Sequence, residues 1–288
     1  MDLVTSVAPW AAFFGAVYCA AWKFSPSLFE AARGLSPADR AYWSTCCSSF
    51  VNGIVTTSLA AAECWRSGLI TSGDFNFTTP GSHLVCHALL GYLVVDSVVL
   101  CFHLRVWAGS GMFAVHHAVA LFGWVTCAHF DYVHNVAVPV VLCEATGPII
   151  NLRWFLSKAG KKETALYAAN GVAIFVSWLV LRVIFLGWMA YDKLIVHQDA
   201  FLALGQPTVG AFLVCYLSSY FLQLAWFWKI LKGVIALFSS DKPKPKRAAA
   251  PPAPPPPPTP KKRKFRWLLC FAPSEPGLGA ISSTLKAD

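Results

Sequence analysis

Long runs of hydrophobic residues alternate with short polar segments along most of the chain. A helix needs about 20 apolar residues, at a rise of about 1.5 Å each, to cross the hydrocarbon core of a bilayer. The fourth and fifth runs are short and joined by a tight HFDYVH turn, so one of them is expected to kink or to be partly re-entrant. The pattern predicts an all-α bundle of about seven transmembrane helices. The runs cover residues 5–22, 44–64, 83–104, 112–130, 134–152, 165–190 and 208–231.

The composition excludes an ordinary soluble domain. Of the 288 residues, 56% are hydrophobic and only 13% are charged, whereas soluble domains carry about 25% charged residues. The first run begins almost at Met1, with no basic residues before it and no small-residue cleavage site after it. It is therefore predicted to be a retained helix and not a signal peptide.

The basic residues predict an orientation. Lys and Arg recur in alternate connections, after the first, third, fifth and seventh runs, and the other connections hold few of them. Because basic loops stay on the cytosolic side, the N-terminus is predicted to be lumenal or external and the C-terminus cytosolic. An N-glycosylation sequon, Asn76-Phe77-Thr78, falls in a connection that this orientation places on the lumenal side. Asn76 is therefore a candidate glycosylation site.

Three segments of different character divide the chain. Residues 1–35 hold the first span and its connection, 36–238 hold the other spans, and 239–288 form a basic, proline-rich tail. The proline run is predicted to be an extended polyproline II spacer outside any packed core. Basic residues 261–264 precede an aromatic and aliphatic cluster, which suits an anionic membrane surface, and Cys270 beside it is a candidate palmitoylation site.

The tail also leaves other interpretations open. It is equally well described as a disordered, solvated segment, and its proline run matches the ligands of SH3 or WW domains. The net charge of the chain is +9, and much of it lies in this tail. That distribution points to a membrane surface as the partner of the basic residues and not to nucleic acid.

Ionisable side chains inside the hydrophobic runs are the strongest functional signal. A charged group at membrane depth costs about 3 kcal/mol, so such groups are expected to pair inside the bundle or to line a wet cavity. Asp96 and Glu144 lie about 12 Å from the predicted cytosolic ends of their runs, and His116 and His117 lie about 7 Å from theirs. These groups on neighbouring helices are therefore predicted to converge. The candidate polar residues are Asp96, His103, His116, His117, Glu144, Asn151, Arg153 and Arg182.

The histidine pair suggests two roles. Adjacent side chains point about 100° apart on a helix, so one ring can meet Asp96 while the other faces a cavity or Glu144. An imidazole accepts or donates a proton near neutral pH, and a buried carboxylate fixes its tautomer and orientation. The alternative is that these groups only tie the helices together through interhelical hydrogen bonds.

No metal ion and no bound cofactor are predicted. Adjacent histidines converge poorly on one ion, and histidine ligands on a helix are usually three or four residues apart. The ten cysteines show no zinc-like CxxC spacing. Most of them lie within the hydrophobic runs, where cysteine behaves as a small apolar residue.

The order and spacing of several motifs carry a family resemblance. They are Gly91-Tyr92-Leu93 with Asp96, the pair His116-His117, Glu144 with Thr146, Pro148, Asn151, Arg153, Trp154 and Phe155, then Arg182, and finally Trp228-Lys229-Ile230 with Lys232-Gly233. Over about residues 40–235 the chain resembles the TLC domain family, which includes ceramide synthases and TRAM translocon proteins. It is most similar to the TLC domain-containing protein 4 subgroup.

The resemblance implies a bundle of six helices around a lipid-sized cavity, here preceded by one extra span. It also implies residence in the endoplasmic reticulum and work in lipid metabolism, trafficking or sensing. By the same resemblance, His116 and His117 would be the nucleophile or general base of an acyl transfer, with Asp96 as the orienting acid and acyl-CoA as substrate. Ceramide synthases carry two aspartates on the following span, whereas this chain offers only Glu144 there and lacks the threonine of their HHxxT pattern.

Two functions follow from these features. One is a lipid-homeostasis protein that binds or senses an acyl-chain lipid, related to sphingolipid, ceramide or phospholipid, with membrane lipids as its partners. The other is an acyl-CoA-dependent N-acyltransferase of the ceramide synthase type. A transporter is less favoured because the sequence has no internal repeat and no matching pair of Gly/Pro-broken helices.

Overall fold

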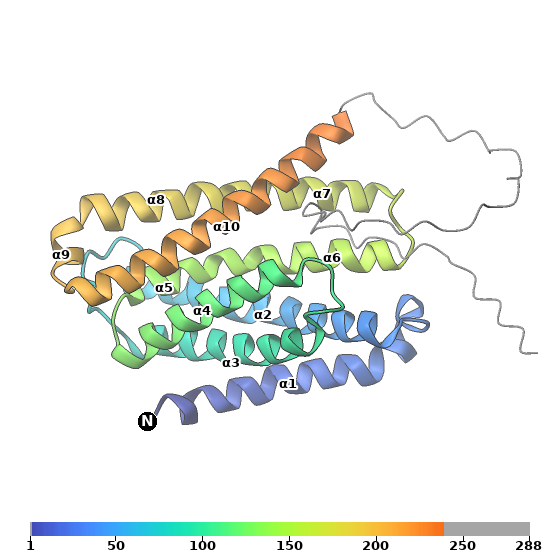
Figure 1. The fold of residues 1–288 in the computed structure, drawn as a ribbon, viewed down its shortest axis with the longest axis horizontal. Helices are drawn as coiled ribbons and strands as arrows, with labels where there is room; N and C mark the ends of the chain where they lie inside the picture. The colour runs from blue at the N-terminus through green and yellow to red at the C-terminus, as the bar shows by residue number, and fades with distance from the viewer. Residues whose placement is uncertain (1, 239–288) are drawn as a thin grey trace, which may run out of the picture.

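The computed structural model describes residues 2–238, and within this range every regular element is helical. Figure 1 shows the long helices side by side, with α10 crossing the others obliquely. The proline-rich tail, with residues 261–264 and Cys270, lies outside the described residues. The elements are α1 (Leu3–Leu28), η1 (Glu30–Ala32), α2 (Pro37–Ser67), α3 (Pro80–His103), α4 (Ser110–Phe130), α5 (His134–Val140), η2 (Val141–Ala145), α6 (Thr146–Lys158), α7 (Ala165–Ser177), η3 (Trp178–Phe185), α8 (Leu186–Tyr191), η4 (Asp192–Val196), α9 (Gln198–Leu202) and α10 (Gln206–Phe238).

Side-chain caps explain where α2 and α3 begin. The Ser36 hydroxyl accepts a hydrogen bond from the backbone N–H of Asp39 at 3.1 Å, which satisfies one of the free donors in the first turn of α2. Gly68, in the left-handed region at φ 68°, ends this helix. At the start of α3, the Thr79 and Ser82 hydroxyls each accept from the other residue's N–H at 2.9 Å, which is a capping box.

Within the described residues, six helical segments are long and apolar enough to cross a membrane. They correspond to six of the seven predicted runs. The remaining run, 44–64, lies in α2, which is long but is not among the apolar segments. The helical segments are Leu3–Leu28, Pro80–His103, Ser110–Phe130, His134–Lys158, Ala165–Val196 and Gln206–Ile235.

Helix α2 is less apolar because one of its faces carries small polar side chains that are buried in the bundle. Ser44, Ser48, Asn52 and Thr56 recur every four residues, so they form a single stripe along the helix. The helix packs against α1, α3, η2 and α6. Small side chains at such contacts let helix backbones approach closely, and their hydroxyls bond to nearby carbonyls. Ser48, for example, donates to the Phe14 carbonyl of α1 at 3.3 Å.

The fifth run, one of the two for which a kink or a re-entrant segment was predicted, changes its helical geometry along its length. There the α-helix gives way to a 3-10 turn over Val141–Ala145, directly after α5, which contains Pro139. Proline has no N–H to donate and clashes with the preceding turn, so a change in helical geometry at this point is expected. The 3-10 turn carries Glu144.

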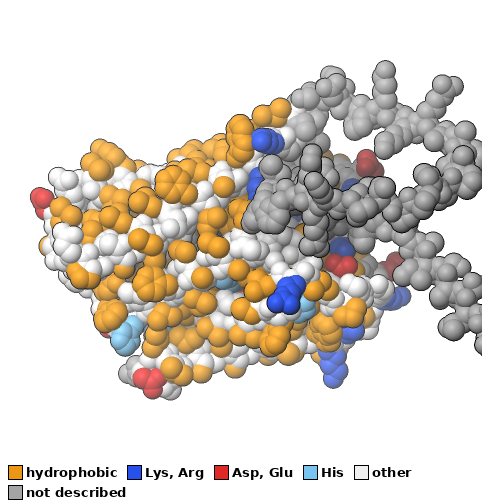
Figure 2. All heavy atoms as spheres, in the orientation of Figure 1, with side chains coloured by type: hydrophobic (Ala, Val, Ile, Leu, Met, Phe, Trp, Pro, Cys, Tyr) orange, Lys and Arg blue, Asp and Glu red, His pale blue; other side chains and the backbone are white. Residues whose placement is uncertain are grey.

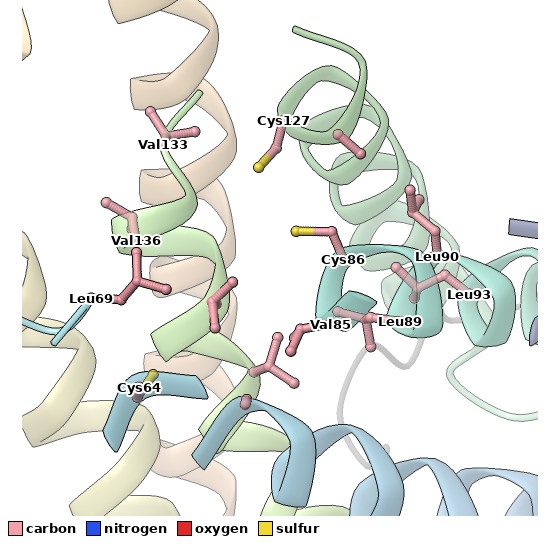
Figure 3. Packing of buried hydrophobic residues seen from close by; sticks show 14 of the residues in the cluster. Cys64, Leu69, Val85, Cys86, Leu89, Leu90, Leu93, Cys127, Val133 and Val136 are labelled. Carbon is pink, nitrogen blue, oxygen red and sulfur yellow. The ribbon is translucent and has the colours of Figure 1, made fainter. Parts of the chain in front are cut away.

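The surface of the bundle is largely hydrophobic. Figure 2 shows apolar side chains spread over the flank of the helices, while the Lys and Arg side chains visible in this view gather toward one end. Large apolar residues such as Phe102 (81% exposed) point outward. The main buried hydrophobic cluster includes residues from α2, α3, α4 and α5, among them Cys64, Leu89, Cys127 and Val136 (Figure 3).

Close packing of α1 on α3 depends on Gly91. A side-chain carbon at this position would lie 2.7 Å from the backbone nitrogen of Ala11. We expect Gly91→Ala to lower the free energy of unfolding by about 1–3 kcal/mol, because the two backbones would have to separate. Gly15→Ala in α1 is the matched control, since nothing lies within 4 Å of its added carbon. Thermal unfolding in detergent measures both changes, and equal melting temperatures for the two variants would contradict this account.

Candidate functional site

The predicted polar residues of α3 and α4 meet where the two helices pack together. The Nε2 atom of His117 lies 3.2 Å from a carboxylate oxygen of Asp96, and both side chains are largely buried. The Nδ1 atom of the same ring lies 2.9 Å from the hydroxyl of Ser97. Both ring nitrogens of His117 therefore have partners from consecutive residues of α3. If Nε2–H donates to the carboxylate, Nδ1 accepts from the hydroxyl.

His116 faces a different set of neighbours. Its ring lies at 80° to that of His117 and makes an edge contact with Trp226 of α10 at a centroid distance of 5.5 Å. Its Nδ1 atom is buried and has no hydrogen-bond partner in the described part of the chain. One ring therefore meets Asp96, whereas the other, which was predicted to face a cavity or Glu144, contacts Trp226 of α10.

A second polar network is centred on Arg182, which lies in the π-helical segment η3 and is only 8% exposed. Its guanidinium group pairs with Glu144 at 3.3 Å and is positioned over the ring of Trp178 at 4.9 Å. It also donates to the Thr146 hydroxyl at 2.8 Å, the Cys143 carbonyl at 2.9 Å and the Gln223 side-chain oxygen at 3.2 Å. A buried guanidinium group is tolerated only when its charge and its donors are satisfied in this way.

Glu144 connects this network to α2. One carboxylate oxygen pairs with Arg182, and the other accepts from the amide nitrogen of Asn52 at 3.3 Å. The amide oxygen of Asn52 is buried without a hydrogen-bond partner in the described residues. The contact needs Gly53, because a side-chain carbon there would lie 2.8 Å from the Glu144 carbonyl oxygen.

The two networks are close to each other. The carboxylates of Asp96 and Glu144 are near enough to interact electrostatically, and so are Arg182 and His116. The structure therefore brings five of the predicted polar residues, Asp96, the histidine pair, Glu144 and Arg182, within electrostatic reach of one another inside the bundle.

The other predicted residues lie outside this cluster. His103 bonds the Val99 carbonyl through Nδ1 at 2.8 Å and stacks on Trp107. Arg153 donates to the Tyr167 carbonyl at 3.0 Å and is positioned over the ring of the same residue. Asn151 is buried, and its amide nitrogen has no partner within residues 2–238. His103 and Asn151 are each seven residues from Asp96 and Glu144, so they lie on nearly the same helix faces but about 10 Å farther along the axes. Arg153 is nine residues from Glu144 and projects from the opposite face.

Three polar members of the cluster were missed in the sequence. Asn52, Ser97 and Gln223 contact Glu144, His117 and Arg182 respectively. The amides at positions 52 and 223 were detectable, since each is an isolated amide side chain in a hydrophobic run. Ser97 carried no signal, because serine is common in such helices.

An apolar groove lies beside the cluster, between α2, α6 and α7. Its volume is about 390 Å³, and its walls are apolar except for the buried amide of Asn170. Pro148, one turn after Glu144, lies at its edge, whereas Asp96 and the histidines do not line it. The lining residues are Phe50, Pro148, Ile149, Leu152, Leu166, Ala169, Asn170 and Ala173.

Comparison with known proteins gives the family context of this arrangement. A family model described as TLC domain matches residues 42–232, which include the whole polar cluster. TLC domain-containing protein 4 A of Dictyostelium discoideum is 19% identical over 231 residues, covering 78% of this chain and 88% of that protein. TLC domain-containing protein 1 of Gallus gallus is 25% identical over 198 residues, covering 67% of this chain and 77% of that protein.

The Arg182–Glu144 pair is expected to behave as one unit. Arg182→Met leaves the half-buried Glu144 carboxylate without its counter-charge and should lower the free energy of unfolding by about 3 kcal/mol. Adding Glu144→Gln to that variant should recover part of the loss, because it removes the unpaired charge. Arg153→Met, which removes a guanidinium group outside the cluster, serves as the control and should cost less. Thermal unfolding in detergent gives the comparison, and strictly additive effects in the double variant would refute the pairing.

Proposed function

We propose a function for this chain, which belongs to the TLC domain family and is a multi-pass membrane protein: it acts in lipid homeostasis by binding an acyl-chain lipid inside its helix bundle. The carrying observation is the set of polar contacts between the long helices, in which Asp96 meets His117 and Glu144 meets the buried Arg182. Groups of this kind are rare at membrane depth and mark binding or reaction sites.

The cluster retains unused hydrogen-bonding capacity. His116 Nδ1 and the amide oxygen of Asn52 are buried and have no partner in the described chain. Native proteins leave few such atoms without a hydrogen bond, so these two atoms support a ligand that has polar groups of its own. A lipid headgroup, of the sphingolipid, ceramide or phospholipid kind, has suitable donors and acceptors.

The groove next to Glu144 supports a site for the acyl chain of the lipid. The groove has apolar walls and a volume of about 390 Å³, which suits a hydrocarbon chain and not a solvated molecule. Pro148 and Ile149 of the groove follow the Glu144 turn on the same helical rod. A lipid with its headgroup near Glu144 would therefore have an apolar surface for its chain within one or two helical turns.

The bundle is proposed to contain a seventh span and to adopt a defined orientation. Helix α2 has 31 residues, which give a length of about 46 Å, and its polar stripe faces the other helices and not lipid. The N-terminus is proposed to be lumenal and the C-terminus cytosolic, as the basic connections indicate. Residence in the endoplasmic reticulum rests on the family resemblance. Asn76 is exposed in the connection between α2 and α3, so its glycosylation stays a prediction.

One observation favours an acyltransferase as the second candidate function. The Asp96 carboxylate orients His117, whereas the neighbouring His116 has a ring nitrogen without a partner in the described residues. In an acyl-CoA-dependent N-acyltransferase, His116 would be the group free to take a proton from the attacking amine, and His117 would hold its place in the helix pair. The single acid at Glu144 and the absent threonine favour the binding function over this one.

Lipid binding is tested by filling the groove. We expect purified protein to retain a defined lipid, identified by mass spectrometry after extraction. Ala173→Trp should reduce the molar ratio of this lipid to protein at least fivefold. The adjacent residue Val172 is 56% exposed and does not line the groove, so Val172→Trp should retain the lipid. Equal lipid content in all three proteins, or only bulk lipid in the wild type, would count against this site.

The enzymatic alternative is tested with the same preparations. If the chain transfers acyl groups, acyl-CoA and a sphingoid base should yield N-acyl product. His116→Ala should lower the rate of product formation at least about 100-fold, as removal of a general base does. His103→Ala is the matched control, because this histidine lies outside the cluster. Bound lipid without turnover in the wild type would exclude the enzyme and leave the binding function.

A further inference from the structure

A second cluster of reactive side chains lies toward the other end of the same helices. Cys86 of α3 and Cys127 of α4 are each ten residues from Asp96 and His117 on their helices, or about 15 Å along the axis. His134, the first residue of α5, completes the group. The ligand atoms of these three residues all lie within 4.8 Å of one another.

All three side chains are buried, and they point into the same space. Cys86 and His134 are 0% exposed and Cys127 is 2% exposed. In Figure 3 the sulfur atoms of Cys86 and Cys127 both project from their helices toward the α5 segment that bears Val133 and Val136. Two thiols and an imidazole therefore meet in the packed interior where α3, α4 and α5 join.

The hydrogen bonds of His134 indicate which of its nitrogens is available. The Ser82 hydroxyl lies 2.9 Å from the Thr79 carbonyl oxygen and 2.8 Å from His134 Nδ1. When its single proton goes to the carbonyl, the hydroxyl accepts from Nδ1–H. Nδ1 then carries the ring proton, and Nε2 carries a lone pair. That Nε2 atom is buried without a hydrogen-bond partner in the described residues, although the Cys127 carbonyl lies near the ring.

This arrangement is typical of a metal-binding histidine. Such a ring usually donates its second N–H to an oxygen atom, which fixes the tautomer and directs the other nitrogen at the ion. Here Ser82 takes that role, and the capping box of α3 holds Ser82 in turn. In this tautomer the buried Nε2 lone pair is available to an ion.

We propose that Cys86, Cys127 and His134 bind a divalent transition-metal ion of the zinc type. Zinc is bound tetrahedrally by cysteine sulfur at about 2.3 Å and histidine nitrogen at about 2.0 Å, so its ligand atoms lie about 3.3–3.8 Å apart. Atoms already within 4.8 Å reach that spacing through small side-chain rotations. Two thiolates neutralise the charge of the ion, which a buried site requires.

Binding releases two protons, one from each thiol. The Cys127 thiol donates to the Tyr132 carbonyl at 3.2 Å, and this bond is given up when the sulfur becomes a thiolate ligand. The fourth ligand is expected from an adjoining group, His83 with Asp131, which shares His134 and whose ligand atoms also lie within 4.8 Å of one another. His83 Nδ1 and Asp131 already form a contact of 3.5 Å.

The site explains an unusual backbone between α4 and α5. Asp131 and Val133 have positive φ angles of 54° and 57°, and this region is costly for a β-branched residue such as valine. The turn places His134 against the two cysteines and Asp131 against His83. A metal ion bound across α3, α4 and α5 would stabilise this turn.

The metal content of the full-length protein tests the proposal. Protein purified in detergent without chelator should contain about one zinc per chain by elemental mass spectrometry. Cys86→Ser, Cys127→Ser and His134→Ala should each lower that content at least fivefold. Cys64→Ser is the matched control, because this buried cysteine belongs to the same hydrophobic cluster but not to the ligand group, and it should leave the zinc content unchanged.

A second measurement needs no variant and so does not depend on their folding. After zinc is removed with a chelator, Zn²⁺ added back should protect the thiols at positions 86 and 127 from alkylation, and Co²⁺ should produce a thiolate charge-transfer band. Protection and the band would support the site. Absence of zinc together with no protection, or a disulfide between Cys86 and Cys127 in the peptide map of the native protein, would overturn it.

Discussion

The structure depends on one constraint: a charged group inside an apolar helix bundle must find its partners within the protein. Arg182 illustrates it, because its guanidinium group is satisfied by Glu144, Thr146, Gln223 and a backbone carbonyl. Lys193, near the other end of the same helical rod and only 1% exposed, likewise donates to the Ile70 and Ser72 carbonyls. Since unsatisfied polar groups are costly away from water, these contacts restrict how the helices can be arranged.

The same constraint accounts for irregular features of the helices. The 3-10 turn at Val141–Ala145 directs Glu144 toward both Arg182 and Asn52, and the π-helical segment Trp178–Phe185 carries Arg182 itself. Helix α2 is the least apolar of the long helices because it provides polar side chains to the interior of the bundle. Departures from regular α-helix thus coincide with the polar contacts between helices, as π-helical segments often do at functional sites.

Some polar side chains of the bundle have all their hydrogen bonds within the protein, whereas others keep a buried nitrogen or oxygen that a ligand can use. His117 uses both ring nitrogens on Asp96 and Ser97, and these contacts join α4 to α3. His116 and His134 each retain a buried nitrogen without a partner in the described residues. His116 lies near the start of α4, whereas His134 follows the end of α4 as the first residue of α5. The chemistry that we propose for this protein, lipid binding at one end and metal binding at the other, is assigned to those two available groups.

The sequence by itself determined the helical class and the positions of six apolar spans, and it placed Asp96, the histidine pair and Glu144 at similar predicted depths, because membrane length and the cost of buried charge act on local patterns. It predicted an irregularity in the fourth or fifth run, and only the structure placed a change of helical geometry in the fifth. Only the tertiary structure decided which ring faces Asp96, that Asn52 and Gln223 join the network, and that Cys86, Cys127 and His134 meet. Contacts between distant segments depend on helix rotation and register, and a few degrees of rotation exchange one side-chain neighbour for another. Ligands contributed singly by three helices leave no spacing motif in the chain.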